Sequence, residues 1–168
     1  TDIFAPGNIP TMTYVTSHSF SSQVSQLRSI SFNGDGTYVY VCGIHTSSNP
    51  MGINVVKFPL STPYLLSTKG TGVVTSIPNN TRTIKGLTFL NNGYTLYVNN
   101  SGYCSKYTLT TAYDITTAEL VDSGNLGNNQ IKFCIVNNET ELLSIEARGY
   151  YTKRYLQGYC SQQNEYSS

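Results

Sequence analysis

The chain has few charged residues: they make up 11% of its 168 residues, whereas ordinary soluble domains carry about 25%. The formal net charge is +1, so no charge excess favours binding to nucleic acid or to an anionic membrane. No stretch approaches the ~20 apolar residues of a membrane-spanning helix, and no basic segment followed by an apolar run marks a signal peptide. We therefore expect no nucleic-acid partner and no membrane span.

Residues that commonly carry out catalysis or bind metals are also scarce. The two histidines, His18 and His45, have no partners at the spacing of a metal site. The nine acidic residues are scattered, and no strand–turn–helix nucleophile elbow is present. We therefore predict no catalytic residue, no metal ligand and no cofactor, and we predict that the chain is not an enzyme.

Four cysteines have spacings that match no zinc or redox motif: Cys42, Cys104, Cys134 and Cys160. Cys134 falls on an apolar position of an expected strand, where a thiol behaves as a small buried hydrophobe. A disulfide between any two of the four stays open, because sequence alone does not decide the pairing.

What the chain does have is a repeat of seventeen residues. It runs from Leu27 to Gly43 (LRSISFNGDGTYVYVCG), from Ile84 to Asn100 (IKGLTFLNNGYTLYVNN), and in a weaker copy from Ile131 to Ala147 (IKFCIVNNETELLSIEA). The copies begin 57 and 47 residues apart, close to the ~40–50 residues of a propeller blade. Each copy predicts a strand, a tight turn and a strand.

The alternation within each copy supports this interpretation. In the first strand Arg28, Ile30 and Phe32 are expected to face one way, as period two demands. The turns hold residues that tolerate positive φ, Gly34-Asp35-Gly36 and Asn91-Asn92-Gly93. A third strand follows with a shared lysine, and a fourth is predicted from Tyr113 to Asp122.

These elements predict an all-β fold of propeller-like, four-stranded antiparallel blades. Residues 1–26 hold an outer strand, 27–82 a first blade, 83–130 a second and 131–168 a partial third. That is about three blades, fewer than the usual 4–8 of a closed ring. The chain is then part of a larger ring, or copies associate to complete one; an irregular β-sandwich is the alternative.

The segments SFNGDGTYVYVCG and TFLNNGYTLYVNNSG resemble the YVTN-type β-propeller repeat. The segment YTLTTAYDITTAELV, from Tyr107 to Val121, is similar to a stretch of propeller repeats in phage and other virion proteins. The resemblance covers residues 27–156, although the third copy lacks the turn glycine. It implies a surface or virion protein used for assembly or attachment, with no shared catalytic residue.

We therefore predict a non-enzymatic structural or assembly protein of a virion or cell surface, such as a tail fibre or adhesion protein. A glycan- or receptor-binding module on the same scaffold is the alternative. Its partners would be further copies, other structural subunits, or a glycan or cell-surface receptor, and its location the virion or the extracellular surface.

Two groups of residues are candidates for modification or contact. Three sequons could carry glycans at Asn79, Asn99 and Asn138. The tyrosine-rich C-terminal segment offers aromatic faces for a sugar or a subunit contact; its members are Tyr150, Tyr151, Tyr155 and Tyr159. Strand packing is the simpler role for these tyrosines.

Overall fold

The computed structural model describes residues 16–21, 24, 26–44, 52–100, 102–125, 130–136, 141–146 and 151–155. Over these residues the chain consists of strands, turns and three single-turn 3₁₀ helices of three residues each. The all-β prediction is therefore confirmed. None of the helices in the described part has the length and hydrophobicity to cross a membrane.

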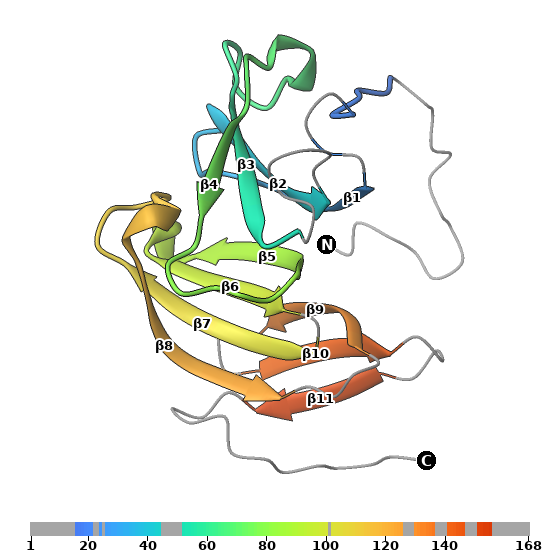
Figure 1. Cartoon of the computed structure of the whole chain (residues 1–168), viewed down its shortest axis with the longest axis vertical. Coiled ribbons are helices and arrows are strands. Elements are labelled where there is room, and N and C mark those ends of the chain that lie inside the picture. Colours follow the sequence, from blue (N-terminus) through green and yellow to red (C-terminus); the bar gives the residue numbers. More distant parts are fainter. Residues whose placement is uncertain are drawn as a thin grey trace, which may run out of the picture.

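The strands form three antiparallel sheets (Figure 1). The first sheet contains β1 (Gln26–Phe32), β2 (Tyr38–Ile44), β3 (Asn54–Pro59) and β4 (Val73–Ser76), in that order. The second contains β5 (Ile84–Leu90), β6 (Thr95–Asn100), β7 (Tyr103–Leu109) and β8 (Ala118–Asn125). The third contains β9 (Gln130–Val136), β10 (Glu141–Glu146) and β11 (Tyr151–Tyr155). Each sheet follows chain order, so every connection joins neighbouring strands.

Turn chemistry fixes the hairpins at the positions that the sequence predicts. Between β1 and β2 the Asp35 carboxylate accepts hydrogen bonds from the Thr37 amide at 2.9 Å and the Thr37 hydroxyl at 2.7 Å. These bonds from Thr37 lower the pKa of Asp35. Between β5 and β6, Asn91 and Asn92 both adopt positive φ, 48° and 51°. Asparagine is one of the few residues that tolerates this conformation.

A tyrosine follows the third strand of both complete sheets and covers the hairpin glycine of its own sheet. Tyr64 and Tyr113 have φ of 61° and 62°. Their amides donate to the carbonyls of Gly36 and Gly93, both at 2.9 Å. A Cβ added at either glycine would fall on the tyrosine ring. Each of the two sheets therefore has its own tyrosine corner, and the two corners are built in the same way from the same residue types.

Because of this corner, the fourth strand of the second sheet begins later in the chain than the sequence predicts. After Tyr113 the chain forms a 3₁₀ turn at Ile115–Thr117, and β8 begins only at Ala118. The Asp114 carboxylate caps this turn by accepting from the Thr116 amide at 3.1 Å. A left-handed residue followed by a capped turn cannot continue a strand, so the prediction of a strand from Tyr113 was wrong at its beginning.

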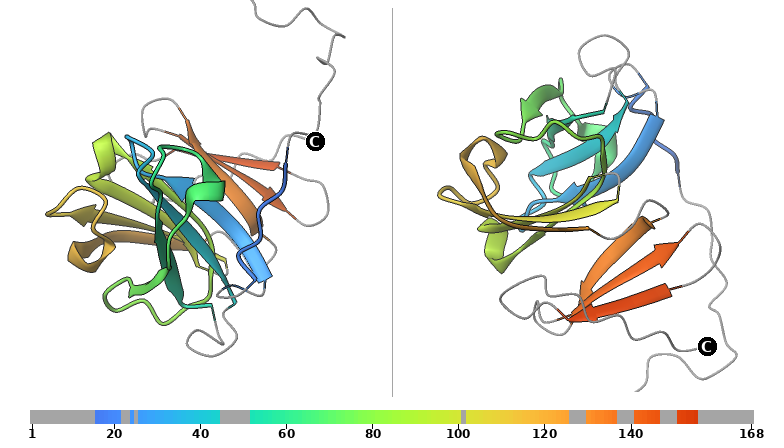
Figure 2. Two further views of the ribbon diagram at one scale, coloured as in Figure 1. Left: turned by 90° about the horizontal axis from the view of Figure 1, so that it is seen from above. Right: turned by 60° about the horizontal axis from the view of Figure 1, so that its bottom comes forward.

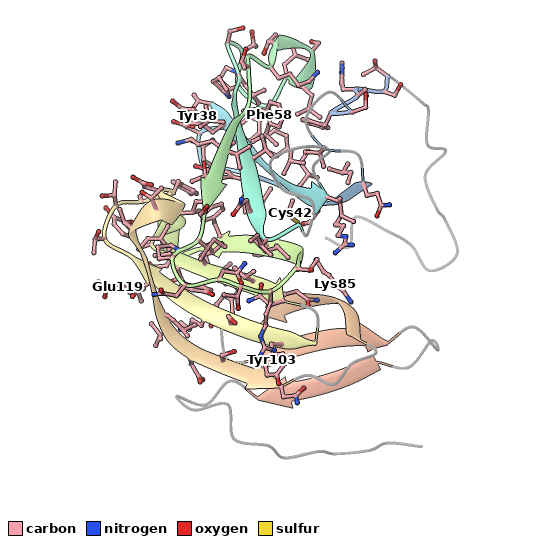
Figure 3. The ribbon with its side chains drawn as sticks, in the orientation of Figure 1. Tyr38, Cys42, Phe58, Lys85, Tyr103 and Glu119 are labelled. Atoms are coloured by element: carbon pink, nitrogen blue, oxygen red, sulfur yellow. The ribbon has the colours of Figure 1, made fainter. Side chains whose placement is uncertain are left out.

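The first strands of the three sheets lie next to one another, β1 beside β5 and β5 beside β9 (Figure 2). Side chains on one face of the first sheet, including Tyr40 and Cys42, pack against the second sheet. Cys42 lies where these two sheets meet (Figure 3). The opposite face, with Val39 and Val41, packs under Phe20 and Val24. The described strands form no closed ring.

Candidate functional site

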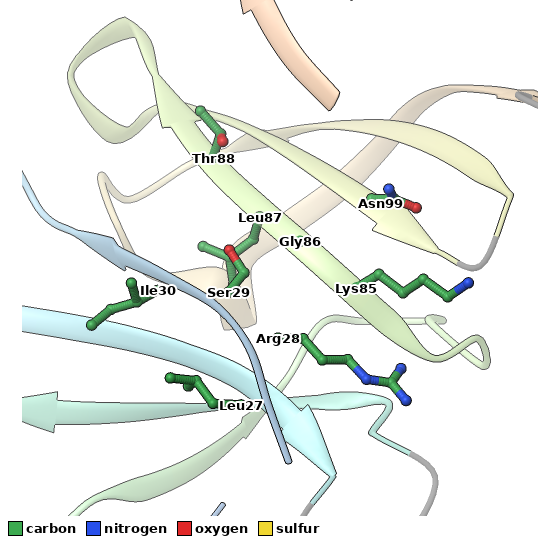
Figure 4. Close-up of a pocket in the computed structure, with 9 residues that line it drawn as sticks. All are labelled: Leu27, Arg28, Ser29, Ile30, Lys85, Gly86, Leu87, Thr88 and Asn99. Atoms are coloured by element: carbon green, nitrogen blue, oxygen red, sulfur yellow. The ribbon is translucent and has the colours of Figure 1, made fainter. Parts of the chain in front are cut away.

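A pocket of about 300 Å³ lies between β1 and β5, the first strands of neighbouring sheets (Figure 4). It is lined by Leu27, Arg28, Ser29, Ile30, Lys85, Gly86, Leu87, Thr88 and Asn99. The volume is at the lower end of the ~300–1,000 Å³ of ligand pockets in proteins. The lining combines two cations, three other polar side chains and three aliphatic ones, a mixture suited to a small polar ligand.

Two β-bulges bring the cations of this pocket together. The β1–β2 register shifts between Leu27 and Ser29, and the β5–β6 register shifts between Ile84 and Gly86. Arg28 and Lys85 are therefore the extra residues of two equivalent bulges. Bulges re-aim side chains and are frequent beside functional sites. The two side chains extend toward the same side of the pocket from neighbouring strands (Figure 4).

The strict alternation expected from the sequence fails at this point. It places Arg28 on the side of Ile30 and Phe32, whereas the bulge takes Arg28 out of the ladder. Sequence reasoning therefore missed both cations of the pocket. One signal was available: the second residue of every repeat copy is basic, Arg28, Lys85 and Lys132. In β9 the register skips Ile131, so Lys132 lies one position beyond the third bulge.

The pocket is electropositive. None of its nine lining residues is acidic. The Nη1 atom of Arg28 is buried, and no described residue accepts a hydrogen bond from it. A buried charged donor without an acceptor is unfavourable, so the described residues leave the hydrogen bonding of the Arg28 guanidinium incomplete.

The lining supplies no acid–base chemistry. It contains hydroxyls at Ser29 and Thr88 but no His, Cys, Asp or Glu to activate them. Cys42 lies opposite Ser29 in the β1–β2 ladder and is not among the residues that line the pocket. Burial raises the pKa of its thiol to about 11, so the thiol is protonated at neutral pH. The part of the chain that the structure describes contains no group of three metal-ligating side chains.

Of the predicted glycosylation sites and contact tyrosines, only Asn79 and Asn99 have side chains that the structure describes, and these two lie in different surroundings. Asn79 is exposed in a turn at φ 59°, whereas Asn99 is buried in β6. A glycan needs surface space, which Asn99 does not have in the folded chain. Asn138, Tyr150, Tyr159, His45 and Cys160 lie outside the described residues. Tyr151 and Tyr155 belong to β11, and their side chains are not among those described.

Neither a family model nor a curated protein matches the chain. The fold is similar to that of a Bacteroides uniformis protein described as a "putative 6-phosphogluconolactonase", with a TM-score of 0.52 and 12% identity over 78% of this chain and 37% of that one. A Bacteroides fragilis protein of the same description gives a TM-score of 0.50 and 19% identity over 77% of this chain and 34% of that one. The chain spans about a third of the length of these proteins.

This likeness corrects the function predicted from the sequence. At these identities it shows the fold alone, and the fold is that of proteins described as enzymes. The prediction of a non-enzymatic structural protein of a virion or cell surface, with its alternative, is contradicted. So is the prediction that the chain is not an enzyme.

Proposed function

We propose that the chain is a segment of an enzyme-like β-propeller whose inner strands bind a small organic anion. Three features support the propeller arrangement: the repeated sheet, the shared corner, and the succession of first strands β1, β5 and β9. In a propeller these strands line the central axis, and the pocket between β1 and β5 would open there.

The observation that carries the proposal is the pair of cations in the pocket. The Arg28 guanidinium, partly buried and with an unsatisfied donor, presents a planar fork that suits a carboxylate or a phosphate. Lys85 adds a second positive charge from the adjacent strand. Hydroxyl groups at Ser29 and Thr88 could bond the polar body of the ligand.

The phosphorylated sugar acids and their lactones are the ligand class that we propose. They combine an anionic group with several hydroxyls, which matches the lining, and the structural neighbours are described by a reaction on such a lactone. Because the lining lacks a general base, hydrolysis in the complete protein would need groups from outside these nine residues.

Titration calorimetry with 6-phosphogluconate tests the proposal. Arg28→Gln should weaken binding roughly ten- to a hundredfold, because a hydrogen bond to a charged group is worth about 1.5–3 kcal/mol. Lys85→Gln should also weaken the binding of 6-phosphogluconate. Lys106→Gln is the matched control: it removes a charge from β7 of the same sheet, outside the pocket, and should leave the affinity unchanged.

Gluconate, which lacks the phosphate, should bind more weakly than 6-phosphogluconate to the unsubstituted chain. If the unsubstituted chain and all three variants bind 6-phosphogluconate equally well, the ligand binds elsewhere. If Lys106→Gln loses as much affinity as Arg28→Gln, binding is a general effect of charge and does not depend on the pocket.

A further inference from the structure

We infer that Asn99 and Gly86 form a specificity subsite, at which the pocket recognises the hydroxyl groups of its ligand beside the two cations that hold the anionic group. The inference rests on the ligand class proposed above and adds to it the residues that separate a polyhydroxylated acid from a plain one. The first and second sheets are built from the same repeat, and they differ at these two positions.

Asn99 is a buried amide at a position that the first sheet fills with a thiol. Asn99 lies opposite Gly86 in the β5–β6 ladder, as Cys42 lies opposite Ser29 in the β1–β2 ladder. The two residues are buried alike, at 1% and 0% exposed, and Cys42 belongs to an apolar cluster. The repeat therefore does not require an amide here, and burying an amide costs free energy that burying a small apolar side chain does not.

Gly86 has no steric reason to be glycine. Its φ is not in the left-handed region, and among the described residues an added Cβ would meet only the Cβ of Asn99, at 3.8 Å, which is an ordinary van der Waals contact. Glycine weakens the interior of a strand and often marks a place where a ligand approaches the backbone closely. The missing side chain leaves space beside Asn99 in the wall of the pocket.

These two residues lie next to the cations of the pocket (Figure 4). Lys85, the extra residue of the β5 bulge, directly precedes Gly86 in the chain. Thr88, two residues beyond Gly86, belongs to the same face of the strand and also lines the pocket. The pocket thus has a cationic part at Arg28 and Lys85, and a neutral hydrogen-bonding part at Thr88 and Asn99.

A carboxamide is suited to a ligand that is rich in hydroxyl groups. The amide group of Asn99 presents a donor and an acceptor in one plane, and a hydroxyl both donates and accepts. Adjacent hydroxyls of a sugar acid can bond both ends of the amide, whereas a plain carbon chain covers the amide without offering either bond. Covering a polar group in this way is unfavourable, so Asn99 should favour a polyhydroxylated anion over a plain anion of equal charge and length.

Titration calorimetry with two ligands of equal charge tests this inference: 6-phosphogluconate, and its hexanoate analogue in which hydrogen replaces every free hydroxyl. Asn99→Leu should weaken the binding of 6-phosphogluconate roughly three- to tenfold, the loss expected for one hydrogen bond between neutral groups. It should leave the affinity for the analogue unchanged or raise it. Asn54→Leu is the matched control: it removes an amide from β3, outside the pocket, and should leave both affinities unchanged.

Gly86→Ala tests the same space without removing the amide. The added methyl group would lie 3.8 Å from the Cβ of Asn99. It should therefore weaken the binding of 6-phosphogluconate roughly tenfold, and that of the slimmer analogue less. Thermal unfolding of each variant shows whether it folds like the unsubstituted chain. If Asn99→Leu does not fold, Gly86→Ala decides the test.

Arg28→Gln separates this inference from the proposed function, because it should weaken the binding of both ligands. If it does so while Asn99→Leu and Gly86→Ala change the two affinities equally or not at all, the inference is overturned and the anion site remains. A lower unfolding temperature of Asn99→Leu with unchanged affinities would make Asn99 a packing residue and would also overturn it. If Arg28→Gln changes neither affinity, or if neither ligand binds, the proposed function and this inference are both wrong.

Discussion

Replacing Gly93 with alanine should lower the free energy of unfolding by about 2–4 kcal/mol, the sum of a left-handed backbone penalty and local overpacking. Gly93 has φ 88°, and an added Cβ would fall on the ring of Tyr113. The ring cannot easily withdraw, because the Tyr113 amide is bonded to the Gly93 carbonyl at 2.9 Å and its own carbonyl is held by Tyr40.

Gly86→Ala is the matched control in the same sheet. A Cβ there would meet only the Cβ of Asn99 at 3.8 Å, and Gly86 has no positive φ. Alanine at this position should change stability by less than about 1 kcal/mol. Urea unfolding followed by circular dichroism measures both variants. Equal effects at Gly86 and Gly93 would show that the tyrosine corner does not hold the hairpin as described.

Replacing Ile84 with alanine should cost about 2–5 kcal/mol, as for other large-to-small substitutions in a core. Ile84 is fully buried between the first and second sheets. Leu27→Ala, at the same position of the preceding repeat copy, should cost little in the monomer because Leu27 is largely exposed. This pair of variants changes one repeat position in two different surroundings.

Urea unfolding at a concentration where the chain is monomeric gives the comparison. A large loss of stability for Ile84→Ala and almost none for Leu27→Ala would support the contact between the first two sheets. Similar losses for both would mean that Leu27 is covered in solution as Ile84 is, which would contradict its exposure in the structure.

The hairpins could be predicted from the sequence because their determinants are local. Period-two alternation and the turn residues Asp35, Asn92 and Gly93 specify a strand, a turn and a strand without help from the rest of the chain. The tyrosine corner was harder to predict from the sequence, since Tyr113 takes a left-handed conformation that its residue type rarely adopts.

The pocket could not be predicted by the same reasoning. Its cations, Arg28 and Lys85, are placed by bulges, and a bulge breaks the alternation on which strand faces are assigned. The pocket also depends on β1 lying beside β5, a contact between residues 57 positions apart in the sequence.

The wrong function came from a resemblance in the repeat alone. A repeat that specifies the sheet says little about the site, because one fold serves many functions and the site residues decide among them. The composition favoured the same prediction, because acidic residues and histidines are scarce. The two basic residues that line the pocket, Arg28 and Lys85, were not part of that prediction.

The most direct test of the proposed site is a crystal structure of the chain with 6-phosphogluconate. We expect the ligand between β1 and β5, with its phosphate or carboxylate within hydrogen-bond distance of Arg28 and Lys85. An empty pocket at saturating ligand, or an anion bound away from both cations, would contradict it.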